Sequence, residues 1–429
     1  MKITKIAGII AEYHPFHNGH AWQMARLREM GYEAVVCAMS PSVVQRGQVA
    51  VLPVGVRAEA ALAGGADLVL ELPAPCACKS AEGFALAGVT VLDALGCVDA
   101  LAFGAETPGV RRLEGAAAAL EGGAFRAALR RRLDEGLPLA AAREAAAEDV
   151  CPGAGALLQS PNNILAVDYC RALLRLSSAM APLALAREGA GHDAALEGVS
   201  GGPERAGGAE ALGCSSEVGR DGDGEAAGGC YASATALRRL AGAKGPQALA
   251  PFVPPACLAI YRRAWDEGLW LDEKALSVAV LSRLRARERF DDVRGAGEGL
   301  ANRLAAAVRT APTLEALTEA LKTKRYPTAR LRRLVLDAAL GYTDALPALP
   351  PYVHVLAANE RGLAVLRAAR PRLPLGAGLA ALERESAACA AMARAHGAAE
   401  DLAALCRVRP QPCGTAYTHK FLLKKQGGV

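Results

Sequence analysis

Apolar and polar positions follow two alternating patterns over the first hundred residues of the chain. Short continuous apolar runs are typical of strands buried on both faces, and the stretches between them have the three-to-four-residue apolar spacing of helices. The runs predict strands at residues 3–11, 34–39, 67–72 and 99–103, and the spacing predicts helices at residues 21–30, 57–63 and 80–95, the last with Ser80 as N-cap. This alternation indicates βαβ units and an α/β fold with a Rossmann-like parallel sheet.

Polar segments follow each predicted strand. They cover residues 12–20, 40–47, 71–79 and 104–107. Parallel strands end at the same edge of their sheet, and ligands of such sheets bind at this carboxyl edge. We therefore expect the functional residues to come from these segments.

The remainder of the chain changes character several times. Residues 109–148 are rich in Ala, Arg, Leu and Glu and predict helix, and residues 160–176 predict a loop that runs into a helix. Residues 198–229 are dense in Gly and small polar residues, so they predict a flexible insertion. Helical patterns continue from residue 254 to about 346, and a shorter mixed tail follows. We divide the chain into an α/β unit at 1–193, the insertion at 194–230, a connecting helix at 231–253, and a mainly α-helical C-terminal domain at 254–429.

Composition is that of an ordinary intracellular protein. Of the 429 residues, 52% are hydrophobic and 22% are charged, and the net charge is only +5. The longest apolar runs end before 18 residues and the N-terminus lacks a signal-peptide pattern, so we expect a cytoplasmic protein without a membrane partner. The 12 cysteines contain no CxxC pair, and we predict no metal site.

The segment after the first strand, residues 12–20, carries the most specific chemistry. It contains three of the seven histidines, and it opens a helix whose first N–H groups attract anions. Gly19 allows a phosphate to approach the backbone. His17 and His20 lie three residues apart, so both rings can reach one phosphate and stabilise charge during its transfer. We therefore predict His17 and His20 as catalytic residues. The alternatives are a loop whose histidines satisfy local backbone groups and, less favoured, a zinc site.

The stretch Gly8-Ile9-Ile10-Ala11-Glu12-Tyr13-His14-Pro15-Phe16-His17-Asn18-Gly19-His20 resembles the signature of the HIGH-type nucleotidyltransferase superfamily and, more narrowly, of the tRNA(Met) cytidine acetate ligase family. Further matching segments follow in order over roughly residues 1–345; they begin at Val44, Asp67, Ser80, Phe103, Ser160, Ala190, Ser233 and Lys324. A lone HxGH motif is weak, whereas an ordered series is specific.

The resemblance implies a nucleotidyltransferase domain that binds ATP and activates acetate as acetyl-adenylate. It further implies transfer of the acetyl group to the wobble cytidine of elongator methionine tRNA, which gives N4-acetylcytidine. The implied nucleotide-binding residues are Ala7, Gly8, Ile9, Ile10, Ala11, Glu12, Tyr13, His14, Pro15, Phe16, His17, Asn18, Gly19, His20, Gly104, Asn162, Asn163, Arg187, Ser233 and Arg238. Three alternatives stay open: Gly104 as a turn glycine, Arg187 as a solvated charge, and Ser233 as the cap of an ordinary helix.

Three positions depart from the family pattern. His14 stands where family members usually have Asn, Pro41 where they have a glycine turn, and Pro53-Val54 where they have an Asp-Lys pair. The missing Lys removes a cation, for which Arg46 and Arg57 are candidate replacements, although Arg and Lys are not interchangeable.

Six basic residues gather late in the chain. They are Lys322, Lys324, Arg325, Arg330, Arg332 and Arg333. On a helix they would present cations along one face, which suits a phosphate backbone, although a solvated helix face explains the charges equally well. The resemblance favours tRNA.

Two other functions share parts of this pattern. A different HIGH-type enzyme would transfer AMP to a small metabolite, and a non-catalytic homologue would only bind RNA or nucleotide. Mg²⁺ is kept open because it commonly accompanies ATP, although no carboxylate pair is evidently dedicated to it.

Overall fold

The computed structural model describes residues 3–186, 231–323 and 325–424. The insertion expected at 194–230, together with Arg187 and Lys324, lies outside the described residues.

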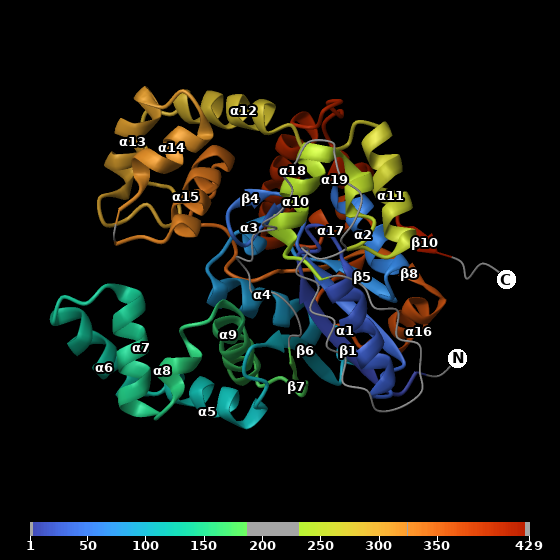
Figure 1. Ribbon diagram of the computed structural model, residues 1–429, viewed down its shortest axis with the longest axis horizontal. Coiled ribbons are helices and arrows are strands. Elements are labelled where there is room, and N and C mark those ends of the chain that lie inside the picture. Colours follow the sequence, from blue (N-terminus) through green and yellow to red (C-terminus); the bar gives the residue numbers. More distant parts are fainter. Residues whose placement is uncertain (1–2, 187–230, 324, 425–429) are drawn as a thin grey trace, which may run out of the picture.

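An eight-stranded sheet forms the centre of the molecule (Figure 1), with the order β10-β8-β5-β2-β1-β6-β7 and β9 beside β8. The N-terminal part comprises β1 (Ile6–Ala11), β2 (Ala34–Met39), β5 (Leu68–Glu71), β6 (Ala100–Ala105) and β7 (Ala181–Ala186). These strands are all parallel, and β1 pairs with β2 from Ile6↔Ala34 to Ala11↔Met39. The predicted α/β fold class and the four predicted strands are confirmed; β7 is an additional strand at the edge.

The C-terminal segment also enters this sheet. Strand β8 (Val353–Asn359) pairs antiparallel with β5, and both β9 (Leu375–Gly376) and β10 (Leu422–Lys424) pair parallel with β8. The prediction of a mainly helical domain at 254–429 does not include these three strands. The pairing of β8 with β5 joins segments hundreds of residues apart, such as Leu68 and Ala358, which a local apolar pattern does not report.

Both faces of the sheet are covered. On β2, Val36 and Ala38 belong to one core while Val35 and Cys37 belong to another, because successive side chains of a strand point to opposite faces. The first core includes residues of α4 (Ala81–Asp93) and α9 (Pro161–Arg175). The second includes residues of α1 (Asn18–Glu29), α2 (Val54–Ala63) and α11 (Pro255–Asp266). The N-cap Ser80 of α4 accepts a hydrogen bond from the backbone N–H of Gly83, at 3.3 Å, as predicted.

The long helical region predicted at 109–148 is divided. It forms α5 (Val110–Glu121), α6 (Gly123–Asp134) and α7 (Leu139–Val150), followed by the short α8 (Ala154–Leu157). The breaks fall at Gly122 and just before Pro138, residues that end or begin helices. The other elements are the hairpin strands β3 (Val43–Val44) and β4 (Gln48–Val49), and α3 (Ala74–Ala77), α10 (Ala234–Lys244), η1 (Pro246–Leu249), α16 (Glu360–Ala368), α17 (Leu379–Glu383), α18 (Ala387–Leu405) and α19 (Thr415–Thr418).

A third core lies in a group of helices at one end of the molecule (Figure 1). The group consists of α12 (Glu273–Arg285), α13 (Leu300–Thr310), α14 (Leu314–Leu321) and α15 (Thr328–Leu340). Val43 and Val49 of the β3–β4 hairpin belong to the same core, so the hairpin connects these helices to the sheet. Among the described residues, no helix has the length and apolar character that crossing a membrane requires.

Candidate active site

A cavity opens at the carboxyl edge of the parallel strands. Its volume is about 450 Å³, and the N-terminal ends of α1, α9 and α10 border it. The first N–H groups of a helix carry partial positive charge, so the starts of α1 and α10 favour an anion in the cavity, whereas the first N–H groups of α9 donate to the carboxylate of Glu106. The cavity lies at the edge where the polar segments predict a ligand site.

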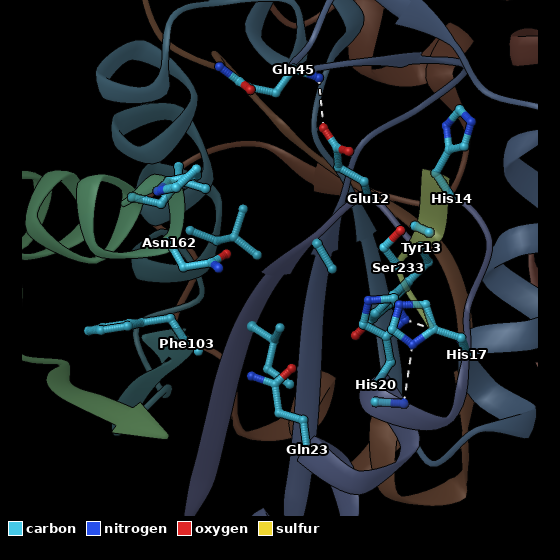
Figure 2. Close-up of a pocket in the computed structure, with 18 of the residues that line it drawn as sticks. Glu12, Tyr13, His14, His17, His20, Gln23, Gln45, Phe103, Asn162 and Ser233 are labelled. Atoms are coloured by element: carbon cyan, nitrogen blue, oxygen red, sulfur yellow. Dashed lines mark hydrogen bonds between the residues drawn. The ribbon is translucent and has the colours of Figure 1, made fainter. Parts of the chain in front are cut away.

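Most residues predicted to hold a nucleotide meet in this cavity. The lining includes Ile9, Ile10, Ala11, Glu12, Tyr13, His14, His17, Gly19, His20, Gly104, Asn162, Ser233 and Arg238. Figure 2 shows Asn162 and Phe103 on the side of the cavity opposite His17 and His20. Residues from both ends of the α/β unit therefore face one another across the space.

Six predicted residues do not line the cavity: Ala7, Gly8, Pro15, Phe16, Asn18 and Asn163. Gly8 is where α4 packs closely on β1, because a Cβ there would lie 2.8 Å from Leu92 Cδ1. Phe16 is fully buried. Asn18 donates from its backbone N–H to the carbonyl oxygen of Phe252, at 2.8 Å. These residues support the motif instead of facing a ligand.

The rings of His17 and His20 are stacked, with centroids 3.8 Å apart and an interplanar angle of 22°. His17 is the N-cap of α1, and its Nδ1 accepts a hydrogen bond from the backbone N–H of Gly19 at 3.1 Å. His20 Nδ1 accepts from the backbone N–H of His17 at 3.2 Å. An accepting Nδ1 places the proton of the neutral ring on Nε2. Both imidazoles are thereby oriented as Nε2–H donors, which suits them to charge that develops on a phosphate.

The turn before α1 places these histidines. Tyr13 adopts φ of 44°, in the left-handed region, and a cis peptide bond joins His14 to Pro15. The Tyr13 hydroxyl and Cys37 Sγ form a buried hydrogen bond of 3.2 Å. The ring of His14 is directed away from His17 and His20 (Figure 2).

His14 is only 4% exposed, and its Nδ1 has no hydrogen-bond partner. Burial, with the positive charges of Arg238, Arg57 and Arg407, holds the pKa of His14 well below its usual value. His14 is therefore neutral at physiological pH.

Glu12 leads from β1 into the cavity and meets the β3–β4 hairpin there. Its Oε1 accepts a hydrogen bond from the backbone N–H of Gln45 at 2.8 Å (Figure 2). Burial raises the pKa of Glu12, although this hydrogen bond and the charges of Arg238, Arg46 and Arg57 act in the opposite direction. Gln45 and Arg46 both line the cavity. Arg46 is thus in place to supply a cation at the border of the cavity.

Arg57 is not a replacement for the missing Lys. It is completely buried, and it donates to the backbone oxygens of Leu52 at 3.2 Å, Glu12 at 2.6 Å, Ser40 at 2.9 Å and Pro41. Arg57 therefore ties together the loops that follow β1 and β2. Val54 of the departing Pro53-Val54 pair is also buried, so Arg46 is the candidate cation that remains on this side of the cavity.

Glu106 connects the end of β6 to the start of α9. Its carboxylate accepts from the side-chain amide of Asn162 and, at 2.9 Å, from the backbone N–H of Asn163. Burial raises the pKa of Glu106, but these hydrogen bonds outweigh it and the pKa is lowered overall. Asn163 is 3% exposed and accepts from the backbone N–H of Thr107 at 3.1 Å. The predicted asparagine pair is thus divided, because Asn162 faces the cavity while Asn163 holds the loop beside Gly104.

The matching segment at residues 233–238, which the resemblance implies as a second nucleotide-binding motif, begins α10. Ser233 is the N-cap and accepts from the backbone N–H of Ala236 at 3.2 Å. Arg238 donates to the carbonyl oxygen of His14 at 2.9 Å and to Thr235 Oγ1 at 3.0 Å. Burial lowers the pKa of Arg238, and Glu12 partly offsets this effect. The two motifs are therefore in direct contact, with a guanidinium at the border of the cavity.

Several lining residues were missed by sequence reasoning. They include Trp22, Gln23, Gln45, Phe84, Phe103, Ile164, Leu165, Tyr169 and Tyr231. Gln45, Phe103, Ile164 and Leu165 lie within the matching segments, so a signal for them existed. The other apolar residues are indistinguishable from core positions in the sequence, because only the tertiary structure shows which apolar side chains border a space.

The basic residues near α15 do not form one helix face. Lys322 and Arg325 precede α15, which begins at Thr328. Within the helix, Arg330 and Arg332 point about 160° apart, since each residue advances roughly 100°. Arg325 and Arg330 lie near Glu298, at 3.3 Å and 3.7 Å, and against the ring of Tyr326. The prediction of a single cationic face is wrong, although exposed cations remain around the start of α15.

Among the residues that the structure describes, no three or more His, Cys, Asp or Glu side chains lie close enough together to hold a metal ion.

Comparison with known proteins gives consistent results. The model of the family HIGH Nucleotidyl Transferase matches residues 4–200 and 218–407. The chain is 32% identical to the tRNA(Met) cytidine acetate ligase of Caldanaerobacter subterraneus, over 86% of either chain. It is 35% identical to the protein of that name from Syntrophotalea carbinolica, over 86% of this chain and 83% of the relative.

Solved structures of Thermotoga maritima TmcAL have the same fold. The apo form superposes with a TM-score of 0.84 at 25% identity, covering 98% of this chain and 100% of the other. The form bound with alpha-thio ATP gives a TM-score of 0.83 at 24% identity with the same coverage.

Proposed function

Because the chain belongs to the HIGH nucleotidyl transferases and, within them, to the tRNA(Met) cytidine acetate ligase family, we propose that it acetylates the wobble cytidine of elongator methionine tRNA to N4-acetylcytidine, using ATP and acetate. The observation that carries the proposal is the pair His17 and His20, whose Nδ1 atoms are both held by backbone N–H groups. The pair lies in a cavity with three helix N-termini.

The proposed first step forms acetyl-adenylate. An acetate oxygen attacks the α-phosphorus of ATP, a new P–O bond forms, and the bond to the leaving pyrophosphate breaks. His17 and His20 donate from Nε2 to the phosphate oxygens as charge grows on them. Arg46 and Arg238 border the same cavity and supply positive charge for the phosphates. The T. maritima structure with alpha-thio ATP supports a nucleotide in this role.

The proposed second step consumes the adenylate. The N4 amine of cytidine attacks the acetyl carbonyl carbon, the C–N bond forms, AMP leaves with the electrons of the C–O bond, and N4 releases a proton. In this proposal, the sheet and α10 hold the nucleotide, while tRNA phosphates are contacted by the exposed Lys322 and Arg325 and by the half-buried Arg330 and Arg332. The proposed substrates ATP, acetate and tRNA are found in the cytoplasm, so we assign the enzyme to the cytoplasm.

The test is acetate-dependent exchange of labelled pyrophosphate into ATP, measured with and without elongator methionine tRNA and over a Mg²⁺ titration. Exchange that requires acetate supports adenylate formation, and mass spectrometry of the tRNA then tests for acetylcytidine. ATP binding without acetate-dependent exchange would contradict the proposal and favour AMP transfer to another acceptor or a binding protein without catalysis.

A further inference from the structure

The backbone of Gln45 forms hydrogen bonds with residues on two sides, Glu12 and Arg333. Its backbone N–H donates to Glu12 Oε1 at 2.8 Å, and its backbone oxygen accepts from Arg333 Nη1 at 3.0 Å. Its side-chain amide donates to the carbonyl oxygen of Lys79 at 3.3 Å. A cavity-lining residue is thereby connected to β1 on one side and to α15 on the other.

The hairpin also touches α15 through its backbone. Gly47 has φ of 70°, and a Cβ at this position would lie 2.4 Å from the backbone nitrogen of Arg333 and 2.7 Å from the carbonyl carbon of Arg332. No side chain fits between the two backbones at this separation. The position of the Gln45-Arg46 tip therefore depends on α15.

Arg333 differs from the cations around it. Its guanidinium is partly buried and directed at Gln45, whereas the side chains of Lys322 and Arg325 are 49% and 67% exposed. A charge-assisted hydrogen bond to a carbonyl oxygen is stronger than a neutral one, so it orients the peptide group between Gln45 and Arg46. Glu12 holds the N–H of Gln45 in the preceding peptide group, and the two contacts together set the direction of the next side chain, Arg46.

From these contacts we infer that Arg333 is a positioning residue of the nucleotide site, which acts through Gln45 on Glu12 and Arg46, and is not an RNA contact. The inference corrects the prediction made for Arg333 from its charge. The inference depends on one part of the proposed function, namely that the cavity binds the nucleotide.

The test compares R333Q and R333K with the wild-type enzyme in the absence of RNA. Dissociation of ATP is measured directly, and acetate-dependent pyrophosphate exchange gives KM for ATP and kcat. We expect R333Q to weaken ATP binding and raise KM about tenfold, the effect of losing one charge-assisted hydrogen bond. R333K keeps the charge and one donor, so it should recover part of the loss.

Two further variants make the test selective. G47A disturbs the same contact from the hairpin side and should also weaken ATP binding. R309Q changes an exposed arginine of α13 in the same group of helices, and it should bind ATP as the wild type does. Thermal unfolding is followed for every variant, because mere loss of stability would lower the active fraction without moving the dissociation constant or KM.

Wild-type ATP binding in a folded R333Q that binds tRNA more weakly would overturn the inference and make Arg333 an RNA contact. If the wild-type enzyme shows no acetate-dependent exchange, the proposed function fails, while the ATP dissociation constants still decide the role of Arg333.

Discussion

His17 and His20 share a hydrogen bond that orients the proposed catalytic pair: the backbone N–H of His17 donates to Nδ1 of His20 at 3.2 Å. The bond forms only when residues 17–20 take up the first turn of α1, since His17 is its N-cap and His20 its third residue. Folding of the helix and orientation of the ring are therefore the same event.

Replacement of His20 tests this pair. We expect H20A to lower kcat for acetate-dependent pyrophosphate exchange by about 10²–10³, the loss typical of one donor to a developing charge. The melting temperature should fall moderately, because H20A removes the hydrogen bond to the His17 N–H at the start of α1, although His20 itself is only partly buried. H20N retains an amide N–H donor, so its kcat should lie between those of H20A and the wild type. Wild-type turnover in H20A would remove His20 from the mechanism.

The two asparagines at the start of α9 should respond differently. Asn163 is buried and holds Thr107, so N163A should lower the free energy of unfolding by about 1–3 kcal/mol in urea denaturation. Asn162 lines the cavity, so N162A should mainly raise the ATP dissociation constant. Equal effects of both variants on stability, with no effect on ATP binding, would contradict this division.

Acid sensitivity is expected from His14. Its pKa in the folded protein lies well below the usual 6.5, so the unfolded chain binds a proton that the folded chain does not as pH falls below 6.5. Stability is then lost on acidification, with a slope of up to about 1.4 kcal/mol per pH unit for one group.

H14N should remove this contribution. Urea unfolding between pH 7 and pH 5 should show a shallower loss of stability in H14N than in the wild type. Identical slopes would mean that His14 takes up a proton in the folded protein.

Salt dependence tests the proposed RNA contacts. Arg325 is 67% exposed, so R325Q should weaken tRNA binding and reduce the slope of log affinity against log salt by about one. R309Q provides a matched loss of one exposed charge in the same helical group. If R309Q and R325Q change the slope equally, the overall positive potential of the surface explains tRNA binding, and a specific contact at Arg325 does not.

The four sheet strands and three longer helices of the first hundred residues were predictable from the sequence, because apolar spacing reports which faces of a local segment are buried, whereas the short β3, β4 and α3 were not predicted. The position of the His17–His20 motif at a helix start was predictable for a similar reason, since His17, Gly19 and His20 lie within one turn of one helix. Ser80 and Ser233 were predictable as caps, because a cap is satisfied a few residues away.

Other features were decided by the tertiary structure. In the sequence, Arg57 is a candidate cation for the site. In the structure it is buried, and its guanidinium donates hydrogen bonds to the loops after β1 and β2. Arg333 belongs to a basic cluster in the sequence, yet it contacts Gln45, 288 residues earlier in the chain. Strand β8 pairs with β5 across a similar separation. Periodicity and charge describe what a segment can do locally, whereas these roles depend on which distant segment lies opposite, and only the folded chain determines that.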